Sequence, residues 1–191
     1  MSPPADASQR KPSLPRRLLD GLYLSAAVLA ALCVVAILLL MMAQVIGREI
    51  GLQVRGADDL TAWFCAAASF LPLAHTFRRG ELIRVTLWIE TLGPARRRRV
   101  ELCCLACAAI FLGFAAFAVV GFVVESWSFN ERAQGMLPIP IWIPQVSFAL
   151  GIVLLWSAVL DDLVGVWRGR LPSYELAERE RRARGELGQG A

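Results

Sequence analysis

Charge is scarce in this chain, and four long stretches have none. Asp, Glu, Lys and Arg make up 19% of its 191 residues, whereas soluble domains average about a quarter. The charge-free stretches cover residues 21–47, 60–77, 102–124 and 133–160. A bilayer core about 30 Å thick is crossed by about 20 helical residues, so each stretch is long enough for one crossing. The missing charge therefore excludes a soluble domain and predicts an integral membrane protein.

Histidine is also scarce, and no cysteine lies outside these stretches. His75 is the only histidine, so a bis-imidazole haem site is excluded, and no carboxylates cluster with it to suggest a metal. The five cysteines include one C-x-x-C, Cys104 to Cys107, at the start of the third stretch. We interpret them as small apolar packing residues, with a quinone-linked membrane redox protein as the alternative. We expect no cofactor.

Ionisable groups are missing from the charge-free cores, and this bears on mechanism. Ion-coupled carriers and proton relays place such groups within the bilayer. The loops offer no nucleophile–base pair either. We therefore expect no buried ionisable group and no catalytic site, so the chain alone is neither a carrier nor an enzyme. A structural membrane subunit that packs against a larger protein fits this composition better.

The length of the apolar stretches predicts an all-α integral membrane fold. We expect four transmembrane helices at about 21–47, 60–77, 100–124 and 141–161, because barrel strands are much shorter and alternate. Pro72 lies inside the second crossing and predicts a kink there. The segment ELIRVTLWIETLGP, residues 81–94, predicts a short interfacial helix between the second and third crossings.

Small residues recur four positions apart along the first three crossings. This spacing lets helices approach closely in lipid. The pairs are Ala26/Ala30, Ala27/Ala31, Ala43/Gly47, Ala62/Ala66 and Ala109/Gly113. We expect some of these pairs to lie at helix contacts.

The basic residues predict the orientation of the chain. Seventeen of the twenty lie in the N-terminal arm, the second loop and the C-terminal tail, and the other three are Arg48, Arg55 and Arg132. The positive-inside rule then puts both termini in the cytoplasm. We divide the chain into a disordered arm (1–16), a transmembrane domain (17–172) and a charged tail (173–191). The net charge of +4 follows from this topology, and no compact basic domain suggests a nucleic-acid partner.

Two segments on the predicted outer side stand out. Asp58 and Asp59 come where the second helix should begin; they either cap its free N–H groups or contact a partner. Residues 134–145, QGMLPIPIWIPQ, form a rigid apolar approach to the fourth helix. Each proline favours extended backbone before it, Trp142 suits the membrane boundary, and Pro144 suits a first helical turn. This approach is either a stiff lead-in or a docking surface for a partner.

Three segments carry a family resemblance. AQVIGREI (43–50), GADDLTAWFCAAASFLPLAHTFRRGELIRVTL (56–87) and GMLPIPIWIPQ (135–145) resemble the small, DctQ-like membrane subunit of tripartite ATP-independent periplasmic (TRAP) transporters. The resemblance covers roughly residues 20–172. It implies a bacterial inner-membrane importer of an organic acid, driven by a sodium gradient. In such an importer a periplasmic solute-binding protein delivers the solute to a large polytopic carrier subunit, and the small subunit is a fixed scaffold.

Topology and charge select the residues that we expect to contact a partner on the outer side. They are Arg48, Asp58, Asp59, Glu125, Glu131 and Arg132, with Trp142 beside them. Besides the redox protein, a stand-alone four-helix membrane adaptor remains an alternative function.

Overall fold

The computed structural model describes residues 14–52, 55–79 and 94–169. Its helices are α1 (Leu14–Glu49), α2 (Ala57–Phe70), α3 (Leu73–Arg79), α5 (Pro94–Ser128) and α6 (Trp142–Trp167). Four stretches of helix are long and apolar enough to cross a membrane: Leu19–Glu49, Ala57–Arg79, Arg96–Ser128 and Trp142–Trp167. Within the described residues the only extended pairing is one bridge between Arg132 and Pro140. The predicted all-α fold with four crossings is confirmed.

The helices extend beyond the charge-free stretches. α1 has 36 residues and α5 has 35. At 1.5 Å per residue each is about 50 Å long, well above the roughly 30 Å of hydrocarbon. Charged residues at both ends of these helices are therefore helical, and the chain is helical from Leu14, inside the arm 1–16. The predicted interfacial helix (81–93), the rest of the arm and the tail (173–191) lie outside the described residues.

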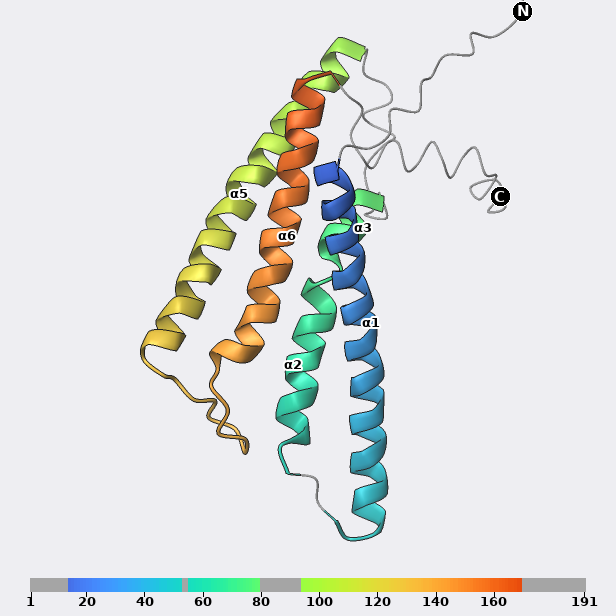
Figure 1. Ribbon diagram of the computed structural model, residues 1–191, viewed down its shortest axis with the longest axis vertical. Coiled ribbons are helices and arrows are strands. Elements are labelled where there is room, and N and C mark those ends of the chain that lie inside the picture. The colour runs from blue at the N-terminus through green and yellow to red at the C-terminus, as the bar shows by residue number, and fades with distance from the viewer. Residues whose placement is uncertain (1–13, 53–54, 80–93, 170–191) are drawn as a thin grey trace, which may run out of the picture.

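The crossings alternate in direction and form a row with α6 in its middle (Figure 1). α5 packs against one side of α6, and α2 and α3 pack against the other, while α1 packs against α2 and α3. The start of α1 and of α5 lies at the same end as the last turns of α3 and α6. We call this the arginine-rich end, because Arg78, Arg79, Arg96–Arg99 and Arg168 lie there. The opposite end, with the connection between α5 and α6, is the hairpin end.

The second crossing is broken at its proline. α2 ends at Phe70 and α3 begins at Leu73, so the kink predicted from Pro72 is confirmed. α6 packs directly against the break: a Cβ atom built on Gly151 would lie 2.5 Å from the Phe70 carbonyl oxygen. Beside the break, the Phe70 and Phe148 rings pack edge to face, with their centres 4.3 Å apart. The absence of a side chain at residue 151 is what lets the two helices approach so closely.

Small residues mark two of the helix contacts, as expected. Ala26 and Ala30 are buried between α1 and α2, in a cluster with Cys33, Ala67 and Leu71. Ala109 is buried against α6, where its carbonyl oxygen accepts a 3.0 Å hydrogen bond from Trp156 Nε1. A Cβ on Gly113 would lie 3.0 Å from that same Trp156 nitrogen.

The other pairs fit the expectation less well. Ala31, Ala43 and Ala62 are exposed, although Gly47, the partner of Ala43, is buried, so at least one member of each of these pairs is not packed within this chain. Spacing alone therefore identified some, but not all, of the close contacts.

Candidate functional site

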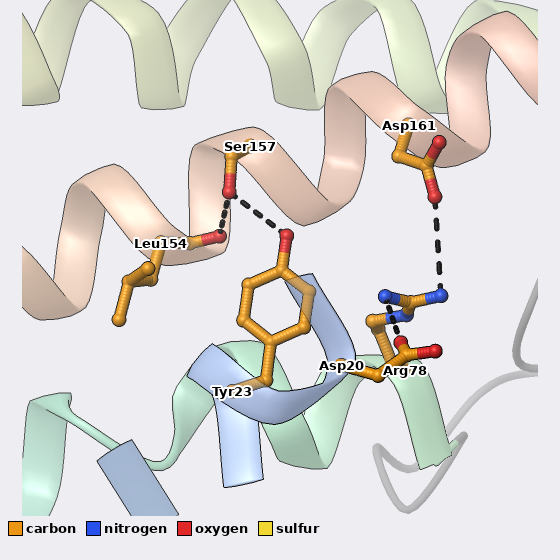
Figure 2. Close-up of polar contacts among 6 residues, drawn as sticks. All are labelled: Asp20, Tyr23, Arg78, Leu154, Ser157 and Asp161. Carbon is orange, nitrogen blue, oxygen red and sulfur yellow. Dashed lines mark hydrogen bonds and ion pairs between the residues drawn. The ribbon is translucent and has the colours of Figure 1, made fainter. Parts of the chain in front are cut away.

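Three helices are joined by charge at the arginine-rich end. Arg78 on α3 lies between Asp20 on α1, at 2.5 Å, and Asp161 on α6, at 3.9 Å (Figure 2). The Arg78 side chain is only 13% exposed, and its guanidinium carbon lies 5.2 Å from the centre of the Tyr23 ring. A cation over an aromatic face adds an attraction of about 0.5–2 kcal/mol. We call this group the Arg78 clasp.

Tyr23 extends the clasp toward the membrane interior. Its hydroxyl lies 2.9 Å from Ser157 Oγ, and Ser157 Oγ donates a 2.7 Å hydrogen bond to the Leu154 carbonyl oxygen (Figure 2). The Ser157 proton is thus used within α6, so the Tyr23 hydroxyl donates to Ser157. Tyr23 is almost fully buried in a cluster with residues of α3, α5 and α6. Its hydroxyl therefore finds a partner instead of being left unsatisfied in an apolar core.

The clasp contradicts the expectation that the helices bury no ionisable group. Asp162 is only 3% exposed, Arg78 is mostly covered, and both lie within stretches long enough to cross a membrane. The predicted second and fourth crossings end at residues 77 and 161, so Arg78 and Asp162 come directly after them. The sequence signal is the pair Asp161-Asp162 directly after the charge-free stretch 133–160. Ser157 faces Tyr23, and the pair lies on the next turn of α6 after Ser157.

At the hairpin end, the proline-rich approach to α6 folds back on itself. The Ala133 amide donates to the Ile139 carbonyl oxygen and the Ile141 amide donates to that of Glu131, both at 3.0 Å. α6 begins at Trp142, with Pro144 in its first turn as predicted. The segment between the two helices is therefore an extended hairpin, defined here as residues 129–141.

The hairpin is fastened to the start of α2. Asp59 Oδ2 accepts a 2.9 Å hydrogen bond from the Met136 amide. Leu137 packs so closely on Gly56 that a Cβ there would overlap its side chain, and Gly56 also has a positive φ of 78°. We call these contacts the Asp59 latch. Both glycine properties matter here, because a side chain at residue 56 would be strained and would also collide with Leu137.

The acidic pair does not cap α2. The capping position is Gly56, which has no side chain to accept a bond, and the structure shows no side-chain cap there. Both carboxylates lie in the first turn, where negative charge complements the helix dipole. Their hydrogen bonds, however, go to other elements: Asp59 to the hairpin and Asp58 Oδ1 to Gln44 Nε2 of α1, at 2.8 Å. The capping interpretation is wrong, because tertiary partners use these oxygens.

The remaining residues predicted for partner contact also lie at the hairpin end. Arg48 is exposed in the last turn of α1, and Glu125 and Arg132 are exposed at the end of α5 and on the hairpin. Glu131 Oε2 accepts a 3.2 Å hydrogen bond from the buried Ser126. Trp142 stacks on Trp127 with ring centres 5.4 Å apart. The latch brings the acidic pair together with the hairpin residues, a contact that sequence spacing did not reveal.

Releasing the latch is expected to loosen the hairpin without unfolding the helices. In Asp59→Ala the Met136 amide loses its acceptor at an exposed site, so we expect a loss of about 1 kcal/mol, confined to the hairpin. Hydrogen exchange should show faster exchange at Met136, with the protection of α5 and α6 unchanged. Asp58→Ala is the matched control and should leave Met136 exchange as it was. Equal exchange at Met136 in both variants would show that the latch does not hold the hairpin.

Among the described residues the structure shows no group of metal ligands and no disulfide. Across 14–52, 55–79 and 94–169, no three or more His, Cys, Asp and Glu residues are grouped as metal ligands would be. The cysteines are free: Cys33 is buried, and Cys65, Cys103, Cys104 and Cys107 are exposed. The packing interpretation thus fits Cys33 alone, because the other four thiols are exposed on the surface of this chain.

Together, four membrane-crossing helices with interhelical charge contacts define a polytopic membrane protein. A family model described as "Tripartite ATP-independent periplasmic transporters, DctQ component" matches residues 37–169. The chain belongs to this family. The matched region includes Arg78, Asp161 and every residue of the Asp59 latch, whereas Asp20 and Tyr23 precede it. Searches of curated proteins and of solved structures returned no match.

Proposed function

We propose that this chain is the fixed scaffold subunit of a TRAP-type importer in a bacterial inner membrane. The match to the DctQ component over residues 37–169 is the observation that carries this proposal. The large carrier subunit then moves an organic acid with a sodium gradient, and a periplasmic binding protein delivers that acid. The small subunit gives the carrier an immobile surface against which to move.

Fastenings at both ends of the helix row support a fixed role. The Arg78 clasp ties α1, α3 and α6 at one end, and the Asp59 latch ties α2 to the α5–α6 hairpin at the other. Between them, Gly151 brings α6 against the backbone of α2. Interiors packed in this way resist sliding, because they have few alternative arrangements of similar energy. A carrier that moves needs several packing arrangements of similar energy.

The arginines support an orientation with the arginine-rich end in the cytoplasm. Nine arginines of the described residues lie at that end, against Arg48, Arg55 and Arg132 at the hairpin end. By the positive-inside rule the hairpin end then faces the periplasm. The hairpin and the α1–α2 turn are thus available to a soluble periplasmic protein.

A docking surface follows from this orientation. Of the residues predicted for partner contact, Arg48, Asp58, Glu125, Glu131 and Arg132 are exposed. Asp59 is engaged in the latch, so it positions the hairpin instead of facing a partner. The mixture of both charge signs suits a transient, salt-sensitive contact with a binding protein of complementary pattern.

Charge reversal at the two arginines tests the docking surface. The Arg48 and Arg132 side chains are exposed and form no hydrogen bond or ion pair with the part of the chain that the structure describes, so Arg48→Glu with Arg132→Glu should leave the fold intact. We expect uptake at limiting binding protein to fall about tenfold, because rim charges chiefly govern the rate of association. Uptake is measured in vesicles that contain both membrane subunits, and their copurification reports assembly.

The control is Arg168→Glu, an exposed arginine at the other end of the row. It should leave uptake unchanged. Uptake at the level of the unmodified protein in the double reversal would refute the docking surface. Loss of copurification would instead assign the two arginines to assembly with the carrier.

A further inference from the structure

A group of arginines is held together where α5 begins and α6 ends. Arg98 Nη2 donates hydrogen bonds to the Val166 and Trp167 carbonyl oxygens, at 3.3 and 3.1 Å. These carbonyls belong to the last turn of α6, which has no basic residue of its own. Arg98 thus closes the end of α6 and fixes the first turns of α5 beside Arg168 and the exposed Trp167. The position of the neighbouring arginines is set by this contact.

Arg96 and Arg99 lie on the outward face of α5, three positions apart, and both are exposed. The first turn of α5 contains no acidic residue, and its helix dipole presents positive charge at this end. Two arginines on one face of a helix, near its positive end, concentrate positive charge at this point of the surface. Such a surface attracts anions.

The same face continues into the membrane as an uncovered apolar strip. From Arg96 and Arg99 it runs at steps of three or four residues through Cys103, Cys107, Ile110, Phe114 and Phe117. The last three are 71–79% exposed, and Cys103 and Cys107 are exposed as well. Trp167, 74% exposed at the end of α6, is the kind of side chain that marks the level of lipid headgroups. The two arginines therefore lie at the depth of lipid phosphates, directly above an apolar strip.

We propose that Arg96 and Arg99 bind the headgroup phosphate of an anionic phospholipid, whose acyl chain lies along this strip of α5. Guanidinium groups bind phosphate oxygens with paired, charge-assisted hydrogen bonds. The small side chains of Cys103 and Cys107 leave room beneath the headgroup for the start of the acyl chain. A soluble phosphate would bind the arginines but would not contact the apolar strip. Because the arginines and the strip are continuous on one face of α5, a lipid is favoured. This site does not depend on the transport role.

Lipid retention by the full-length chain tests the site. The protein is reconstituted in nanodiscs of phosphatidylcholine with or without phosphatidylglycerol, extracted gently, and analysed by native mass spectrometry. The unmodified chain should retain phosphatidylglycerol in preference to phosphatidylcholine and unfold at a higher temperature when it is present. Arg96→Gln with Arg99→Gln should lower this retention about tenfold or more, because two charge-assisted contacts are lost. Circular dichroism verifies that the variant keeps its helices.

The matched control is Arg48→Gln with Arg55→Gln, two exposed arginines at the hairpin end. It should retain phosphatidylglycerol as the unmodified chain does. An equal loss in both variants, or no preference for phosphatidylglycerol, would overturn the proposal. In a second arm, inorganic phosphate is added to phosphatidylcholine nanodiscs at matched ionic strength; a thermal shift equal to that of phosphatidylglycerol would show a soluble-anion site and also overturn it.

Discussion

Placing a methyl group on α6 at Gly151 is expected to destabilise the fold strongly. In Gly151→Ala the new Cβ would lie 2.5 Å from the Phe70 carbonyl oxygen and 2.6 Å from its carbonyl carbon. Both are backbone atoms at the break between α2 and α3, so no side chain can rotate away. Overpacking of this kind costs about 1–3 kcal/mol or more. Thermal unfolding in detergent should show a lower transition temperature.

The same change at Gly121 is the control for this prediction. Gly121 is also inside a long apolar helix, but a Cβ built there meets nothing within 4 Å. Gly121→Ala should unfold at the temperature of the unmodified protein or slightly above it, because alanine favours helix more than glycine does. Equal transition temperatures for the two variants would show that α6 does not approach α2 as closely as described.

Neutralising Arg78 is expected to have the second large effect. In Arg78→Gln, Asp20 and Asp161 face each other without the cation between them, and Tyr23 loses the charge over its ring. Removing one member of a fully buried ion pair costs about 3–5 kcal/mol. The two carboxylates are 51% and 39% exposed, so we expect a smaller loss, about 2 kcal/mol. Unfolding in detergent measures it.

A double variant separates the ion pair from a general effect of charge. Arg78→Gln combined with Asp20→Asn should cost less than the sum of the two single changes, since the second removes a carboxylate that the first left without its cation. Arg168→Gln, at an exposed arginine of the same end, should change stability by less than about 0.5 kcal/mol. Strict additivity of the two clasp variants would mean that Arg78 and Asp20 do not interact.

Most of the fold could be read from the sequence, because lipid imposes few choices. Long charge-free stretches must be helical to satisfy their backbone groups, so the four crossings followed from length alone. Pro72 has no amide hydrogen to donate, and it marks the break between α2 and α3. Residues of DctQ-like pattern in the middle of the chain also identified the family that the family model confirms.

The contacts between helices could not be read in the same way. Asp161 and Asp162 directly follow the charge-free stretch that ends at residue 160, where solvent is the usual expectation for a carboxylate. Both are helical because α6 continues to Trp167, and the ion pair of Asp161 depends on Arg78 arriving from another helix. Likewise, Asp59 lies where capping residues usually lie, yet its partner comes from 77 positions further along the chain. Such pairings can be predicted only when it is known which helices are neighbours.

The central place of α6 has a consequence for how the protein is made. It leaves the ribosome after the other three crossings, yet α5 packs mainly against it, and α2 and α3 pack against it at their break, beside Gly151. Until it is inserted, α5 is a solitary helix in the bilayer and the kinked crossing has one face open to lipid. Packing of the other three crossings is therefore complete only once α6 is inserted, and chains that stop before residue 142 should be degraded faster by membrane proteases.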